Sequence, residues 1–148
     1  MVAGGGPILV LSLVFAHHVR VVQGQGELAA VKSTLGALRT TLVIDHLQRN
    51  VRPDHSFVAT TRHNPFELLQ HRPPNYLGEM NRESAAQAPP GSWVFDVDCV
   101  CVGYRPLDGQ WFESPSGERI AQFLVSGAPG PLQLSAREAY IWRGEAMN

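Results

Sequence analysis

The sequence is short of the residue types that build metal sites. Only two of its 148 residues are cysteine, Cys99 and Cys101, whereas a structural zinc site takes four ligands, commonly from two separated pairs. A metal site would have to recruit His55, His63 or His71, and their spacing does not demand it. We therefore expect no metal and no cofactor.

Catalytic motifs are missing as well. Among the six histidines there is no His-Glu-x-x-His pattern, and no serine stands in the Gly-x-Ser-x-Gly turn of α/β-hydrolases. Gly24 and Gly26 lack the third glycine of a phosphate-binding loop. These absences predict a protein that is not an enzyme.

An excess of either charge is also lacking. The chain carries 12 Lys and Arg against 13 Asp and Glu, a formal net charge of -1, whereas a polyanion is held by a strongly positive surface. We therefore expect no nucleic-acid partner. The length and a hydrophobic content of 44% suffice for one buried core.

What the sequence does have is an apolar beginning. Residues 1–19 hold no Lys, Arg, Asp or Glu, and apolar side chains are densest from Pro7 to Ala16. A bilayer span takes about 20 apolar residues, and about 10 to 14 are more typical of a signal-peptide core or a buried helix. A cleaved signal peptide normally opens with Lys or Arg, but none precedes Arg20. We therefore expect the segment to be retained, either in a membrane or packed against neighbouring copies. The expected assembly residues are Pro7, Ile8, Leu9, Val10, Leu11, Leu13, Val14, Phe15, Val19 and Val22.

A second apolar pattern has the period of a helix. Five apolar residues beyond Glu27 are spaced 3, 4, 3 and 4 positions apart, which places them on one side of an α-helix. The other side is polar, with Lys32, Ser33, Arg39 and Thr40. We expect the apolar stripe to pack on a sheet. Its members are Leu28, Val31, Leu35, Leu38 and Leu42.

Glycines divide these two helical patterns. Gly24 and Gly26 each cost about 1 kcal/mol against Ala in a helix interior, so we expect a soft point there, either a kink or a melted stretch. The helix should end before Pro53, because proline disfavours helix at the residue preceding it. The expected organisation is an apolar helix over residues 1–24 and a head over residues 25–148 that includes the amphipathic helix.

Strand patterns dominate the rest of the chain. Asn64-Pro-Phe-Glu67 opens a short helix, with an N-cap residue, a proline at the first helical position and a Glu three residues after the cap. Residues 75–91 are typical of a surface connection. A long helix followed by antiparallel strands predicts an α+β fold, with a long N-terminal α-helix packed on a four-stranded antiparallel sheet. The four strands are expected near residues 93–95, 100–104, 119–125 and 138–142.

Cys99 and Cys101 lie two positions apart near the start of the second expected strand. A disulfide between them closes a very small ring, which the geometry of the bond allows only at a turn. The alternative is two free thiols, which would be exposed to oxidation in an extracytoplasmic protein. Both states are open on the sequence alone.

Taken in order, an apolar start, an amphipathic helix and a strand-rich head, the chain resembles the type IV pilins, a family that includes type II secretion pseudopilins and minor pilins. The resemblance covers about residues 7–142. The family's usual Glu at the fifth mature position is Gly5 here, which implies a different entry into a filament. The phrases that carry the resemblance are Ala29–Leu42, Asn64–Leu69, Pro74–Glu79 and Pro89–Asp96.

The resemblance implies a structural subunit of a pilus-like or pseudopilus filament that assembles through its apolar helix. Its expected partners are copies of itself or other pilin-like subunits, and the inner membrane before assembly. The head would be extracytoplasmic, and the filament extracellular or periplasmic. The alternative is a membrane-tethered extracytoplasmic binding domain that does not polymerise and binds its partner through Tyr76, Trp111 and the 105–118 loop.

Overall fold

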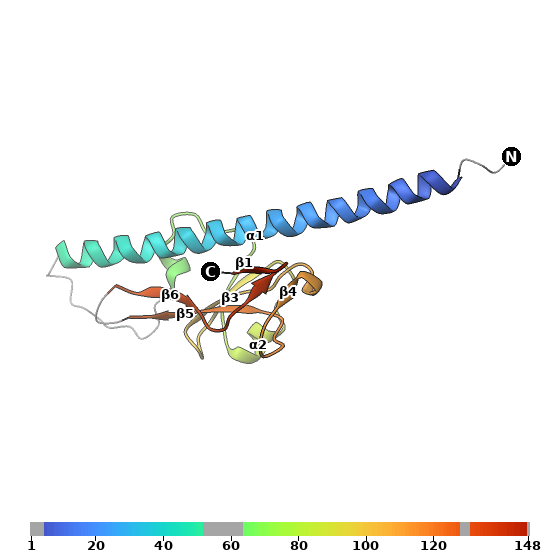
Figure 1. Cartoon of the computed structure of the whole chain (residues 1–148). Coiled ribbons are helices and arrows are strands. Elements are labelled where there is room, and N and C mark those ends of the chain that lie inside the picture. The colour runs from blue at the N-terminus through green and yellow to red at the C-terminus, as the bar shows by residue number, and fades with distance from the viewer. Residues whose placement is uncertain (1–4, 52–63, 128–130, 148) are drawn as a thin grey trace.

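One helix, α1 (Gly5–Val51), runs the whole length of the molecule, and a β-rich head lies against its second half (Figure 1). The computed structural model describes residues 5–51, 64–127 and 131–147, without the side chains of residues 5–9, 20 and 21. At a rise of about 1.5 Å per residue, the 47 residues of α1 span about 70 Å. The fold is therefore α+β, and the first half of α1 projects beyond the head.

Short helices and short strands make up the head. The predicted helix start at Asn64 is confirmed, because the Asn64 side chain accepts a hydrogen bond from the Phe66 backbone N–H at 3.0 Å and begins a 3-10 helix. In chain order, the elements of the head are η1 (Pro65–Leu68), β1 (Tyr76–Met80), α2 (Arg82–Ala86), β2 (Trp93–Asp96), β3 (Cys101–Tyr104), η2 (Gly109–Trp111), β4 (Phe112–Glu113), β5 (Ala121–Ser126), β6 (Gln133–Ala136), β7 (Ile141–Trp142) and β8 (Glu145–Ala146).

The main sheet is mixed and has five strands, in the order β1-β2-β3-β5-β6. Neighbouring strands from β2 to β6 pair antiparallel, with Asp96 opposite Cys101 beside the β2–β3 turn. β1 instead runs parallel to β2, with Tyr76 opposite Trp93, and α2 lies in the connection between them. β4, β7 and β8 form a second, smaller sheet. The predicted four-stranded antiparallel sheet is therefore wrong in strand number and in strand direction.

The two strands of the main sheet that the sequence did not predict lie at its edges. β1 falls within residues 75–91, where a surface connection was predicted, and its residues alternate between half-buried and exposed. In β6 only Leu134 is buried. An edge strand has one hydrogen-bonded neighbour and buries few of its side chains, so its sequence signal is weak. Conversely, the strand predicted at 138–142 is only Ile141–Trp142 and belongs to the small sheet.

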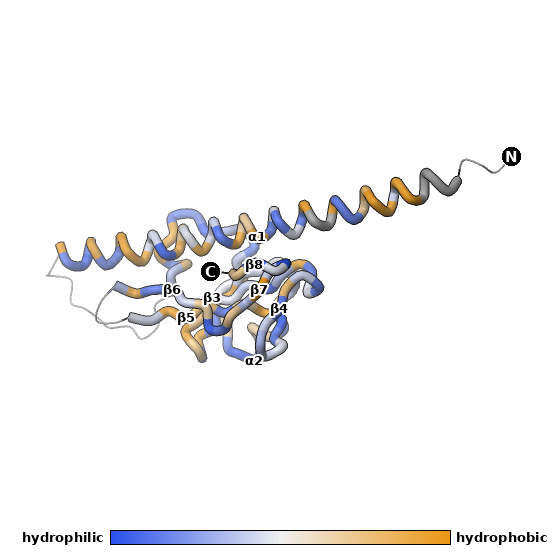
Figure 2. Tube along the Cα trace, viewed as in Figure 1, coloured by the Kyte–Doolittle hydropathy of each residue, from blue (hydrophilic) through white to orange (hydrophobic). Residues whose placement is uncertain are grey.

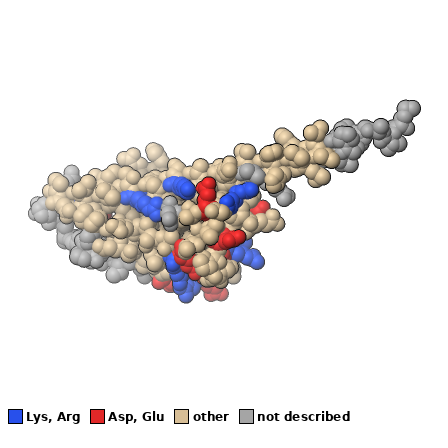
Figure 3. Space-filling view, in the orientation of Figure 1, with Lys and Arg blue, Asp and Glu red and all other residues tan. Residues whose placement is uncertain are grey.

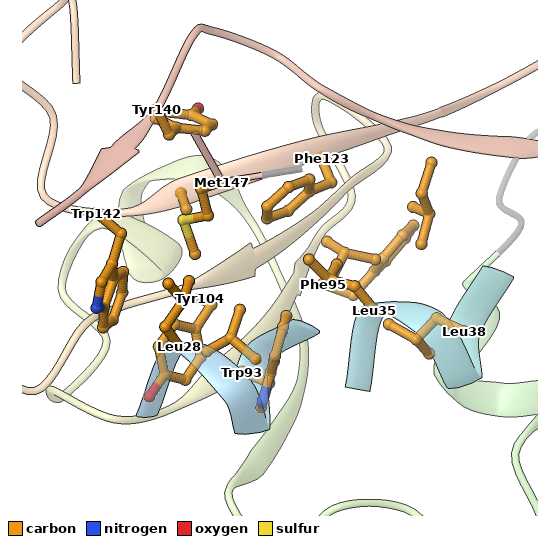
Figure 4. Close-up of a cluster of buried hydrophobic side chains, with 14 of the residues drawn as sticks. Leu28, Leu35, Leu38, Trp93, Phe95, Tyr104, Phe123, Tyr140, Trp142 and Met147 are labelled. Carbon is orange, nitrogen blue, oxygen red and sulfur yellow. The ribbon is translucent and has the colours of Figure 1, made fainter. Parts of the chain in front are cut away.

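The core lies between the second half of α1 and the main sheet. The five stripe residues are all buried, with exposed fractions between 0% at Leu35 and Leu38 and 6% at Leu28. They form one cluster with large aromatic side chains of the strands, Trp93 and Phe95 among them (Figure 4). This apolar contact fixes the head on α1.

The melted stretch that was one form of the predicted soft point at Gly24 to Gly26 is wrong, because α1 continues through these residues as one helix. Gly24 is buried against the head, where a Cβ would come within 3.1 Å of the Arg143 Cδ and 3.5 Å of the Trp111 ring. Trp142 Nε1 also donates a hydrogen bond to the Gly24 carbonyl oxygen at 2.9 Å. Tertiary packing thus overrides the low helix propensity of glycine, and α1 enters the head as a continuous rod.

Candidate assembly surface

The N-terminal half of α1 stands clear of the head. Every described side chain of residues 10–23, which we call the arm, is exposed. The exposed fractions reach 68% at Leu11, 72% at Leu13 and 71% at Phe15. Figure 2 shows the apolar turns of the arm in orange, and Figure 3 shows its described part without Lys, Arg, Asp or Glu. The described part of the arm is therefore an apolar projection without charged side chains, and Arg20, whose side chain lies outside the described set, is the one Lys or Arg of the arm.

Seven of the ten predicted assembly residues have exposed side chains on the arm. The side chains of Pro7, Ile8 and Leu9 lie outside the described set, although their backbone belongs to α1. Within the described residues, no helix combines the length and the apolar character that a membrane crossing requires. The seven exposed residues are Val10, Leu11, Leu13, Val14, Phe15, Val19 and Val22.

In the first part of the arm, from Val10 to Phe15, apolar side chains surround the helix instead of lining one side. Five of the six positions from Val10 to Phe15 are large and apolar, and consecutive positions of an α-helix differ by about 100°. A helix that is apolar all round belongs in an environment without water. Contiguous exposed apolar surface of this kind marks an interaction site on soluble proteins.

The head holds the base of the arm in place. Trp142 is fully buried and donates to the Gly24 carbonyl, while the Arg143 guanidinium lies 6.0 Å from the centre of the Trp111 ring beside the same turn of α1. These contacts come from the second sheet and the turn before it, far along the chain from α1. They set the direction in which the arm leaves the head.

A buried carboxylate secures the next turn of α1. Glu27 is 8% exposed, and its Oε1 accepts hydrogen bonds from the Tyr104 hydroxyl at 2.9 Å and from the Leu107 backbone N–H at 2.8 Å. Its Oε2 has no hydrogen-bond partner among the described residues. Burial raises the pKa of Glu27 above its usual range, against the lowering effect of the two hydrogen bonds, and the nearby Asp108 raises it further.

Replacing Glu27 with Gln should stabilise the head increasingly as the pH rises. Because folding raises the pKa of Glu27, the folded state favours the protonated carboxyl group. Its contribution to the free energy of unfolding is complete below the ordinary value of 4.5 and is lost as the pH rises through the folded value. Gln keeps an oxygen that can accept from Tyr104 and Leu107, and it carries no charge. Urea unfolding at about pH 4 and about pH 8 measures the stability of variant and wild type.

A stability difference between Glu27→Gln and wild type that is equal at both pH values would contradict this role for Glu27. The control is Glu27→Ala, which removes both hydrogen bonds and leaves the buried Tyr104 hydroxyl without its acceptor. It should lower the free energy of unfolding by about 2 kcal/mol.

A second surface of α1, which we call the outward stripe, lies on the side of the helix opposite the buried stripe of Leu28 to Leu42. Its eight residues are exposed and uncharged, and they are spaced 4, 3, 4, 3, 4, 3 and 4 positions apart. This spacing is the repeat with which one helix packs along another. The outward stripe consists of Gly26, Ala30, Ser33, Ala37, Thr40, Ile44, Leu47 and Val51.

The two cations predicted for the wet side of α1 turn toward the head. Arg39 donates from Nη2 to the Leu134 carbonyl oxygen at 3.2 Å, and Lys32 Nζ lies 4.0 Å from a carboxylate oxygen of Glu145. Both therefore flank the outward stripe and leave it uncharged. The sequence pattern predicted a polar face here because Ser and Thr were counted with the charged residues.

Cys99 and Cys101 form a disulfide in the turn between β2 and β3. Val100 between them has a φ of +56°, a left-handed conformation that a β-branched residue rarely adopts. Both sulfurs are thus bonded and unavailable to a metal. The described residues contain no group of three His, Cys, Asp or Glu that could hold one, and His55 and His63 lie outside them.

The aromatic residues of the alternative binding surface lie in separate places. Tyr76 stacks on Phe66 with ring centroids 4.1 Å apart, whereas Trp111 lies beside Trp142. The 105–119 segment does line an open hollow of about 680 Å³, but neither Tyr76 nor Trp111 contributes to its wall. The predicted three-part surface is therefore not assembled as one site.

Comparison of the chain with known protein families, with curated proteins and with solved structures yields no match.

Proposed function

We propose that the chain is a structural, non-enzymatic subunit of a filament of the type IV pilin or pseudopilin kind, which assembles through the arm. The observation that carries the proposal is the arm itself, about 20 Å of helix whose described side chains are exposed and mostly apolar. Transfer of such surface from water into an apolar contact is the main driving force of association.

In this proposal the arm of one copy packs along the outward stripe of another. The small residues in the first half of the stripe, from Gly26 to Ala37, permit close approach of a second helix. Larger apolar side chains follow, with exposed fractions of 48% at Ile44 and 57% at Leu47. Arm and stripe are different surfaces of the same helix, so each copy can donate one and accept the other. Such head-to-tail contacts build open filaments unless the rotation closes a ring.

The proposal places the head outside the cytoplasm and the arm at the inner membrane before assembly. The Cys99–Cys101 disulfide supports an extracytoplasmic head, because disulfides persist in oxidising compartments and are rare in the cytosol. Filament partners are copies of this chain or other pilin-like subunits.

Electron microscopy and sedimentation of the purified full chain test this function. Wild type should form filaments that pellet, and Ala37→Glu should reduce the pelleted fraction severalfold or more, because it places a charge on the outward stripe. Ala86→Glu is the matched control, since Ala86 is exposed at the end of α2. Dispersed particles at every concentration would contradict the filament and favour the alternative, a tethered binding domain that uses the hollow beside residues 105–119.

A further inference from the structure

Two adjacent histidines interrupt the apolar arm. His17 and His18 are both exposed, and their ring centroids lie 6.1 Å apart at an interplanar angle of 63°. Consecutive positions leave a helix about 100° apart, so the two rings cover a wide sector of the arm. In the proposed filament, a neighbour that packs over this sector of the arm contacts at least one of the two rings.

No carboxylate of the arm is available to pair with a protonated histidine. The first Asp or Glu in the sequence is Glu27, and Arg20 is the one Lys or Arg in the first 26 positions. Within the described residues, the head does not cover His17 or His18. Protonation would thus add positive charge to a segment that has no negative charge of its own.

The surface that would face these histidines in the filament offers no compensation either. The eight residues of the outward stripe are uncharged. Along its flanks, Lys32 and Arg39 are cations, and Asp45 is already paired with Arg49 at 2.9 Å. Lys32 approaches Glu145 at 4.0 Å. A histidinium placed here would lose water without gaining an unengaged carboxylate.

We propose that His17 and His18 make filament assembly depend on pH, because protonation of either exposed imidazole opposes packing of the arm. Histidine gains or loses its charge between about pH 5 and pH 8, and a charge in a dry helical bundle is costly. This inference rests on the proposed filament function and adds its regulation. When the pH is lowered, each ring that is protonated takes one proton from solvent, and no other reactant is consumed.

The experiment measures the critical concentration for assembly of the full chain at about pH 8 and about pH 5, by sedimentation and electron microscopy. Wild type should need about tenfold or more protein at the lower pH. The double variant H17Q/H18Q should assemble equally well at both pH values, because Gln is polar and uncharged. The double variant H17R/H18R, with a permanent charge, should assemble poorly at both. H71Q, an exposed histidine of the head, should keep the wild-type response.

The outcomes separate this inference from the filament function. Wild-type filaments with the same critical concentration at both pH values overturn the histidine switch and leave the filament standing. A pH response that persists in H17Q/H18Q, or that disappears in H71Q, also overturns it. If neither wild type nor H17Q/H18Q assembles at any pH, the filament proposal itself fails. Circular dichroism at both pH values checks that the head stays folded.

Discussion

Replacing Leu13 with Asp should abolish filament assembly while the head stays folded. Leu13 is 72% exposed on the arm, so the change removes no contact within the subunit. In the assembled state it would place a carboxylate in an apolar helical contact, which costs about 3 kcal/mol in a comparable environment. That cost corresponds to a rise of about 100-fold in the critical concentration, measurable by sedimentation. The unfolding midpoint in urea should equal that of wild type.

The matched control for this change is Leu77→Asp. Leu77 lies in β1 of the head and is 50% exposed, so it receives the same substitution at a similarly exposed leucine away from the arm. This variant should form filaments at the wild-type concentration. Normal assembly of Leu13→Asp, or equal loss of assembly in both variants, would contradict the assignment of the arm.

Replacing Leu35 with Ala should produce the largest loss of stability among single changes in α1. Leu35 is 0% exposed and sits at the centre of the buried stripe, in the same cluster as Trp93 and Phe95. Removal of a buried leucine side chain costs about 3 kcal/mol, because the transfer free energy is lost and a cavity remains. Urea unfolding of the full chain, followed by circular dichroism, measures the difference.

The control for Leu35→Ala lies on the opposite side of the same helix. Leu47 belongs to the outward stripe and is 57% exposed, so Leu47→Ala should change the free energy of unfolding by about 0.5 kcal/mol or less. It should instead weaken assembly, because it removes apolar surface from the proposed seat of the arm. Equal destabilisation by both variants would contradict the assignment of Leu35 to a buried side of α1 and of Leu47 to an exposed side.

The helical part of the fold follows from sequence pattern because its signal is local. The spacing of Leu28, Val31, Leu35, Leu38 and Leu42 defines one side of a helix without reference to any other element, and the structure buries all five. The apolar character of the arm can also be predicted from the sequence, because a run of large apolar residues is visible without knowledge of what it contacts. The α+β class then follows from the order of helix and strands.

The features that the sequence did not reveal depend on contacts between distant segments. β1 and β6 become strands by pairing with β2 and β5, although only Leu134 among their residues is buried. The helix persists at Gly24 because Trp142, 118 positions away, bonds to it. The sequence also did not reveal the outward stripe, because Lys32 and Arg39 are close to its residues along the chain. In the structure both side chains contact the head and leave the stripe uncharged.

Burial of the arm between copies can be measured by labelling a cysteine at position 13. The native cysteines are bonded to each other, so Leu13→Cys introduces the one free thiol, and Leu77→Cys provides the same thiol on the head. A maleimide reagent should modify Leu13→Cys quickly in dispersed subunits and far more slowly in filaments, while Leu77→Cys reacts at one rate in both. Equally fast labelling of Leu13→Cys before and after assembly would show that the arm stays in water, which contradicts its role as the assembly surface.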